Sequence, residues 1–133
     1  MASDDVKMDR RYTKDHEWAK KDGGEVLVGI TAFAVDQLGD ITLVNLDVQA
    51  GDTLTAGKAF GTIESVKTLS DLFAPISGRV VRINAELSHR PELVNADCWG
   101  EAWMIALAPS DIKELDKLLD HGAYAALLQS PQH

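Results

Sequence analysis

Apolar and polar residues alternate over short segments of this chain of 133 residues. A period of two is typical of half-buried β-strands. Glycine, proline and aspartate separate the segments at short intervals, which favours a compact antiparallel sandwich or barrel over a parallel sheet with crossover helices. Strands are expected at residues 12–19, 25–30, 41–46, 53–54, 58–65, 68–73, 78–83 and 102–107.

Turn and cap residues indicate where several of these elements begin and end. Asp22-Gly23-Gly24 lies between the first two strands, and Asp-Gly followed by glycine supplies the positive φ angles that a tight hairpin requires. Thr31 can cap a short helix through Leu38, which Gly39 would close. Residues 91–95 predict one helical turn with proline at its first position.

The C-terminal part has the pattern of an amphipathic helix. Ser110 or Asp111 can cap it, with Glu114 three residues after Asp111. Its apolar stripe is expected to pack on the sheet and consists of Ile112, Leu115, Leu118 and Leu119. Gly122 marks a break, and residues 123–128 predict a last short helix.

Length and patterning predict one domain. A chain of this size removes about two thirds of its unfolded surface from water and needs neither disulfides nor a metal to fold. Residues 1–11 are polar and lack periodicity, so we expect a flexible N-terminal tail, a single domain over residues 12–128 and a C-terminal tail over residues 129–133.

The net charge of −8 argues against nucleic-acid binding, because neutralising phosphates requires clustered Lys and Arg. The short basic runs are Arg10-Arg11 and Lys20-Lys21 alone. No apolar run approaches the ~20 residues of a membrane-spanning helix, and the acidic start resembles neither a secretory signal nor a transit peptide. We expect a soluble, cytoplasmic bacterial protein with no membrane contact, or a mitochondrial matrix protein if the chain is a mature eukaryotic form.

No catalytic or metal site is expected. The four histidines are far apart in the sequence: His16, His89, His121 and His133. None has the spacing of a zinc ligand pair, and the single cysteine, Cys98, has no histidine within a local ligand motif. Catalysis by Cys98 would need a base brought close in space, and a small half-buried side chain suits its position better.

One lysine stands near the bend between two short strand-like segments. By pattern alone, Lys67 could be an exposed lysine that discourages pairing between sheets. The acids Glu64 and Asp71 flank it. They could form a solvated hairpin surface or serve recognition, and the pattern leaves both interpretations open.

The amino acids around this lysine are more informative than the hydrophobic pattern. Glu64-Ser65-Val66-Lys67, Ser70-Asp71 and residues 74–78 closely resemble the lipoylation hairpin of the glycine cleavage system H protein family. Other segments resemble the landmarks of that family in order and spacing: residues 12–18, 28–31, 38–40, 91–95 and 100–104. The resemblance covers residues 12–128, and several motifs in one order are more specific than any single motif.

The resemblance implies a fold that is mainly β with flanking helices. This fold is a lipoyl/biotinyl-type flattened β-sandwich, or barrel-sandwich hybrid, with a C-terminal helix. The resemblance also implies lipoic acid in amide linkage on Lys67, which would change the formal charge from −8 to about −9. The residues implied in recognition of the hairpin are Glu64, Ser65, Val66 and Asp71.

A member of this family is a monomeric carrier, not an enzyme. In the family, a pyridoxal-phosphate glycine decarboxylase transfers the aminomethyl group left after decarboxylation onto the lipoyl sulfur. A folate-dependent aminomethyltransferase takes the one-carbon unit and releases ammonia, and dihydrolipoyl dehydrogenase reoxidises the dithiol. A lipoyl ligase, or a lipoyl transferase with a synthase, attaches the arm. The cofactor supplies the covalent chemistry, and the protein presents it.

The loaded arm of the family folds back onto its carrier, away from water. Glu17, in the matching His-Glu-Trp motif, is the candidate for a polar group that lines this recess. Two positions depart from the resemblance. Gln37 stands where some members have histidine, and Ala102 stands where glycine is common before the tryptophan.

Alternative functions remain open on the sequence. Biotinyl domains usually flank the modified lysine with methionines, whereas Val66 and Thr68 stand here. A lipoyl domain of a 2-oxoacid dehydrogenase would lack the segments before residue 40 and after residue 108. An H-like lipoyl protein of another pathway, such as lipoyl relay or sulfur oxidation, would share the hairpin and most of the fold. A purely structural or interaction module would leave Lys67 unmodified.

Overall fold

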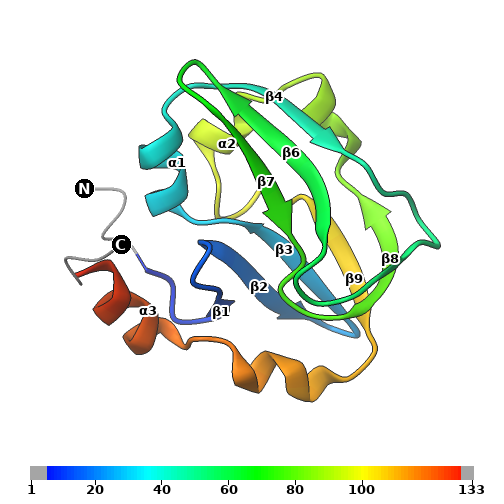
Figure 1. Ribbon diagram of the computed structural model, residues 1–133. Coiled ribbons are helices and arrows are strands. Elements are labelled where there is room, and N and C mark those ends of the chain that lie inside the picture. The colour runs from blue at the N-terminus through cyan, green and yellow to red at the C-terminus, as the bar shows by residue number, and fades with distance from the viewer. Residues whose placement is uncertain (1–5, 130–133) are drawn as a thin grey trace.

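A computed structural model describes residues 6–129, and the strands in this range form two antiparallel sheets (Figure 1). The larger sheet has the order β1-β2-β3-β9-β8-β5. Its strands are β1 (Arg11–Tyr12), β2 (Glu17–Asp22), β3 (Glu25–Ile30), β5 (Thr53–Leu54), β8 (Gly78–Ile83) and β9 (Ile105–Pro109). The smaller sheet has the order β4-β6-β7, with β4 (Ile41–Leu46), β6 (Ala59–Ser65) and β7 (Leu69–Phe73). The prediction of an antiparallel arrangement is confirmed.

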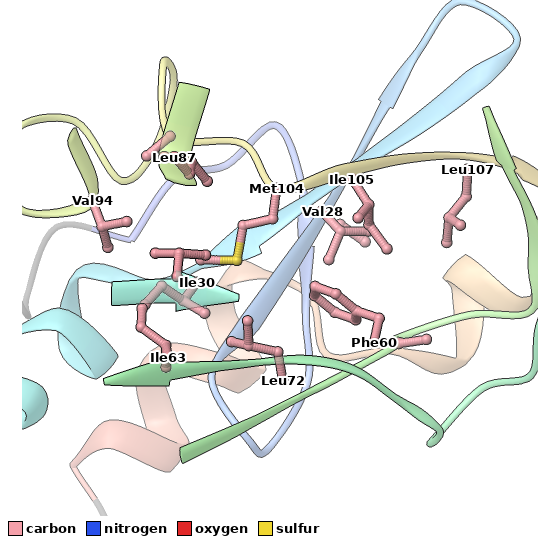
Figure 2. Packing of buried hydrophobic residues seen from close by; sticks show 14 of the residues in the cluster. Val28, Ile30, Phe60, Ile63, Leu72, Leu87, Val94, Met104, Ile105 and Leu107 are labelled. Carbon is pink, nitrogen blue, oxygen red and sulfur yellow. The ribbon is translucent and has the colours of Figure 1, made fainter. Parts of the chain in front are cut away.

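The two sheets face each other, and the main hydrophobic core fills the space between them (Figure 2). Phe60 and Leu72 of the smaller sheet lie opposite Val28 and Ile105 of the larger sheet, and all four side chains are buried. Burial of a large apolar side chain contributes about 1.5–3 kcal/mol. The core therefore joins the two layers into the β-sandwich that the resemblance implies.

Short helices flank the sandwich. They are α1 (Ala32–Leu38), α2 (Leu93–Ala96) and α3 (His121–Leu128), with 3₁₀ segments at Ala85–Ser88 and Ile112–Lys117. The predicted caps of α1 are confirmed. The hydroxyl of Thr31 accepts a hydrogen bond from the backbone nitrogen of Ala34 at 3.2 Å, and Gly39 ends the helix with φ of +80°.

The last strand begins later than predicted. The pattern placed it at residues 102–107, but β9 begins at Ile105. The backbone nitrogen of Ala102 donates to the carbonyl of Asp97 at 3.1 Å, and that of Trp103 donates to the carbonyl of Gly100 at 3.2 Å. These bonds close a turn, so neither residue is available to a strand.

The first predicted strand, residues 12–19, is divided in the structure. A turn separates β1 from β2, and the backbone nitrogen of His16 donates to the carbonyl of Thr13 at 3.1 Å within it. The hairpin that follows joins β2 and β3 as predicted, with Asp22 paired to Glu25. Its positive φ angle, +65°, is at Gly23.

Order at the N-terminal side begins before Tyr12, the predicted boundary. Arg11 already belongs to β1, and Arg10 is only 9% exposed. The guanidinium of Arg10 lies over the rings of Trp18 and Trp99, 4.6 and 5.3 Å from their centroids. Such cation–π contacts join residues far apart in sequence, so no local pattern indicates them. Residues 1–5 and 130–133 of the expected tails lie outside the described residues.

The amphipathic α-helix predicted from residue 111 is wrong in type and length. Asp111 caps a six-residue 3₁₀ segment that ends at Lys117, and Leu118 is extended. Leu119 then exchanges two backbone hydrogen bonds with Tyr12, at 2.8 and 2.9 Å. This pairing with the edge strand requires extended backbone, so the helix cannot continue through residue 119. The C-terminal helix is α3, which begins after Asp120.

Candidate functional site

Lys67 lies at the tip of the hairpin that joins β6 and β7, at the upper left of Figure 1. The tip is a tight turn, because the backbone nitrogen of Ser65 donates to the carbonyl of Thr68 at 2.8 Å. The hydroxyl oxygen of Ser65 accepts hydrogen bonds from the backbone nitrogens of Lys67 and Thr68, both at 3.1 Å. A serine side chain thus fixes the turn, as serine commonly does.

The tip is also anchored to the segment that joins α1 to β4. The backbone nitrogen of Val66 donates to the carbonyl of Asp40 at 3.0 Å. Asn95, from α2, holds this segment from the other side, since its amide donates to the carbonyl of Gly39 at 3.0 Å and its oxygen accepts from Ile41 at 2.9 Å. Two segments that resemble family landmarks, residues 38–40 and 91–95, therefore support the lysine-bearing turn.

The side chain of Lys67 passes close over Gly39. A Cβ atom at Gly39 would lie 3.2 Å from Cε of Lys67, which is closer than side chains normally approach. Gly39 also has the positive φ angle that favours glycine. This backbone therefore allows the lysine stem to lie across it, while Lys67 as a whole remains exposed.

A cleft of about 260 Å³ lies beside the hairpin, between β7, α1 and the start of β2. Its polar lining includes Glu17, Gln37, Ser70 and Asp71. The full lining is Asp15, His16, Glu17, Ile30, Phe33, Ala34, Gln37, Leu38, Ile63, Ser70, Asp71 and Leu72. The structure thus brings Glu17 and Asp71 to one cleft, while Lys67 lies outside its lining. Gln37, one of the two departures from the family pattern, also lines it.

Glu17 is a buried acid that connects the two sheets. It is 3% exposed and belongs to β2 of the larger sheet. The hydroxyl of Thr13 donates to its Oε1 at 2.7 Å, and the backbone nitrogen of Phe73, at the end of β7, donates to its Oε2 at 3.3 Å. Burial raises the pKa of Glu17 to about 7; the two hydrogen bonds act in the opposite direction, and the charge of Asp15 adds to the rise.

His16 has a backbone conformation that residues other than glycine rarely adopt, with φ of +72°. Its Nδ1 lies 2.8 Å from the hydroxyl of Tyr124, which lies 2.7 Å from the hydroxyl of Thr31. Its ring packs on Phe33, with centroids 4.6 Å apart. Sequence reasoning missed this group, because a tyrosine of α3 more than a hundred positions away completes it.

Among residues 6–129, the structure shows neither an activated cysteine nor a cluster of metal ligands. Burial raises the pKa of Cys98 to about 11, so its thiol stays protonated and unreactive near neutral pH. Within this range, no group of three or more His, Cys, Asp or Glu side chains could hold a metal ion. The helices of the described part are also too short or too polar to cross a membrane.

Comparisons with known proteins agree with this arrangement. The family model described as glycine cleavage H-protein matches residues 10–131. A glycine cleavage system H protein of Magnetococcus marinus is 53% identical over 119 residues, which cover 90% of this chain and 84% of the relative. A glycine cleavage system H protein of Thermus thermophilus is 48% identical over 126 residues, which cover 95% of this chain and 98% of that relative.

A solved structure is similar as well. The crystal structure of a glycine cleavage system H protein from Mycobacterium marinum matches with a TM-score of 0.85 and 37% identity, over 94% of this chain and all of that chain. Fold and hairpin together define a carrier of the lipoyl-domain class, built as a β-sandwich with a lysine at a hairpin tip. Within that class, the chain belongs to the glycine cleavage H-protein family.

The raised pKa of Glu17 predicts a dependence of stability on pH. An unshifted glutamate has a pKa of 4.5, so between this value and about 7 the folded protein binds more protons than the unfolded chain. The free energy of unfolding therefore falls as pH rises through this window. Glu17→Gln removes the titration, and we expect it to be more stable than the wild type at about pH 8, by at most about 3 kcal/mol.

Denaturant unfolding at several values between about pH 5 and pH 8 measures this difference. The free energy of unfolding should change less with pH in Glu17→Gln than in the wild type. Glu101→Gln, a substitution at an exposed position, should show the same dependence on pH as the wild type. Parallel curves for Glu17→Gln and the wild type would contradict the raised pKa.

Proposed function

We propose that this chain is the lipoyl carrier of a glycine cleavage system, with the lipoyl group in amide linkage on Nζ of Lys67. The observation that carries the proposal is the placement of Lys67. In a chain of the H-protein family, it lies at the tip of a hairpin that Ser65, Asp40 and Asn95 hold in place. The family bears lipoyl groups, and the exposed amine at this tip is compatible with amide formation.

The sequence provides the attachment point, and the fold presents it. The lipoyl group supplies two sulfur atoms that can accept a one-carbon fragment and return to the disulfide form by oxidation. The hairpin tip keeps Lys67 exposed, so that an arm attached to it can enter a partner's active site without the bulk of the carrier. Tethering also gives effective concentrations on the order of millimolar once a partner docks.

The cleft beside the hairpin is our candidate recess for the loaded arm. Glu17 and Asp71 line it from opposite sheets. Glu17 could accept a hydrogen bond from an amine placed there, and a positive charge nearby would lower its pKa and favour the carboxylate. The low exposure of Glu17 supports a site from which bulk water is excluded.

The proposal includes the partners that the family implies. They are a pyridoxal-phosphate glycine decarboxylase, a folate-dependent aminomethyltransferase, dihydrolipoyl dehydrogenase and the enzyme that attaches the lipoyl group. In this proposal the chain is a monomer and has no catalytic residues of its own. We propose the bacterial cytoplasm as its location, because the matched relatives are bacterial. Its net charge of −8 would favour docking to basic surfaces.

Intact mass tests the attachment point. The chain has eight lysines, and incubation with a lipoyl ligase, lipoate and ATP should add the mass of one lipoyl group. We expect Lys67→Arg to gain none, because the guanidinium cannot form this amide, whereas Lys58→Arg should be modified like the wild type. A wild-type chain without added mass, or a modified Lys67→Arg, would overturn the assignment.

Labelled glycine separates glycine cleavage from the other pathways that share this scaffold. The lipoylated chain is mixed with glycine decarboxylase and glycine labelled at its α-carbon. We expect label on the carrier, since that carbon is the one retained after decarboxylation. Without label, an H-like lipoyl protein of another pathway, such as lipoyl relay or sulfur oxidation, becomes the better assignment.

The role of Glu17 is tested by the lifetime of the loaded carrier. In Glu17→Ala the cleft loses its buried carboxyl, and we expect the aminomethyl group to be released faster, by about tenfold if one charge-assisted hydrogen bond is lost. Release is followed as formaldehyde or ammonia over time. Glu101→Ala is the control at an exposed position. An unchanged release rate in Glu17→Ala would remove the support for this role.

A further inference from the structure

Consecutive residues line the cleft beside the hairpin at the start of β2: Asp15, His16 and Glu17. In an extended strand, successive side chains point to opposite faces. His16 interrupts this alternation, because it lies immediately before β2 with a φ angle of +72°. A left-handed residue at this position turns the chain between Asp15 and Glu17, so that side chains on both sides of it face one cleft.

The conformation of His16 is held through both its backbone and its ring. Its backbone nitrogen donates to the carbonyl of Thr13 at 3.1 Å, and its carbonyl accepts from the backbone nitrogen of Thr31 at 2.9 Å. Its ring packs on Phe33, which also lines the cleft, and its Nδ1 lies 2.8 Å from the hydroxyl of Tyr124. Residues in rare conformations persist only where their surroundings fix them, and they concentrate at functional sites. We therefore asked what the ring of His16 offers to the cleft.

Tyr124 reaches His16 from α3, which packs beside β1 (Figure 1). Tyr124 is fully buried, and its ring stacks on Tyr12 with centroids 4.4 Å apart. Burial raises the pKa of Tyr124, so its hydroxyl keeps its proton. This hydroxyl lies between Nδ1 of His16 and the hydroxyl of Thr31, which is 2.7 Å away. The three groups form a chain of hydrogen bonds from the cap of α1 to the edge of the cleft.

The number of protons assigns a direction to this chain of hydrogen bonds. The hydroxyl oxygen of Thr31 accepts from the backbone nitrogen of Ala34, and Thr31 is fully buried, so the Thr31 proton needs an acceptor of its own. The hydroxyl oxygen of Tyr124 is the acceptor within reach. The proton of Tyr124 then goes to Nδ1 of His16, which accepts it only when Nδ1 is unprotonated. A neutral histidine ring carries one proton, so this proton is on Nε2. The reverse direction would leave the Thr31 proton buried without an acceptor, which costs free energy.

The cleft therefore has a hydrogen-bond donor and an acceptor on adjacent residues, the Nε2–H of His16 and the carboxyl of Glu17. An amine uses both, because its N–H groups donate and its nitrogen lone pair accepts. An aminomethyl group on sulfur is lost when this lone pair forms a double bond to carbon and the carbon–sulfur bond breaks, with the electron pair leaving on sulfur. Water then converts the fragment to formaldehyde and ammonium. A hydrogen bond donated to the lone pair opposes this loss.

We propose that Tyr124 is a positioning residue that holds His16 with its proton on Nε2, and that this N–H donates to the nitrogen lone pair of an aminomethyl group bound in the cleft. The first part is a property of the chain alone, and the second part rests on the proposed function. The helix α3 contributes no residue to the lining of the cleft. In this proposal it nevertheless sets the lifetime of the loaded arm, through the hydroxyl of Tyr124.

Nitrogen-15 NMR of the unmodified chain tests the tautomer. With both ring nitrogens of histidine labelled, we expect a protonated Nε2 and an unprotonated Nδ1 for His16, whose signals are identified among the four histidines by their loss in His16→Gly. Tyr124→Phe keeps the ring and removes the hydroxyl, and it should lose the single tautomer. The matched control is Tyr12→Phe, which removes the hydroxyl of the stacked neighbour and should keep the tautomer. A proton on Nδ1 in the wild type, or an unchanged tautomer in Tyr124→Phe, would overturn the proposal.

The lifetime of the loaded carrier tests the contact with the arm. His16→Gly removes the ring, and glycine readily adopts a positive φ angle, so the turn before Glu17 is retained. We expect His16→Gly and Tyr124→Phe to release formaldehyde about two- to tenfold faster than the wild type, which is the range for one lost hydrogen bond. Tyr12→Phe should release it at the wild-type rate. Thermal unfolding checks that each variant is folded.

Wild-type release rates in both His16→Gly and Tyr124→Phe would overturn the contact with the arm, even with the expected tautomer. A wild-type chain that cannot be lipoylated and loaded would refute the proposed function, and the second part of this proposal with it. The tautomer of the unmodified chain would still decide the first part, so the two failures are distinguishable.

Discussion

The arrangement around Lys67 depends on the close approach of two backbone segments. The turn at Ser65–Thr68 lies against Gly39 and Asp40, with a hydrogen bond between Val66 and Asp40 and the lysine stem across Gly39. Bulk at residue 39 would force these segments apart. The helix cap, the start of β4 and the lysine-bearing turn therefore form one unit, and the rest of the sandwich holds that unit in place.

Elements with local causes could be predicted from the sequence. The caps of α1 and the hairpin at Gly23 depend on residues that are neighbours in the chain. The strands of the β6–β7 hairpin and their bend followed from alternation and turn residues. The assignment of Lys67 as a lipoyl site comes from family resemblance and stays a prediction. The fold class is confirmed by the sheets and by the solved relative.

Features with distant causes could not be predicted. The burial of Arg10 depends on Trp99, and the end of the 3₁₀ segment at Lys117 depends on pairing between Leu119 and Tyr12. The bulge in β4 reverses the direction that alternation assigns to Leu43. Glu17 is a candidate from resemblance alone, whereas its bond to Phe73 and its raised pKa depend on packing between the two sheets, which no local pattern indicates.

The contact of Asn95 with Gly39 and Ile41 has a consequence for the order of events in the cell. These partners are 56 and 54 positions apart in sequence, so the contact forms only when α2 has packed against the sandwich. A nascent or misfolded chain contains the same lysine motif but lacks the supported turn. An enzyme that requires the supported turn would pass over such chains, and the cofactor would be spent only on carriers that have completed folding.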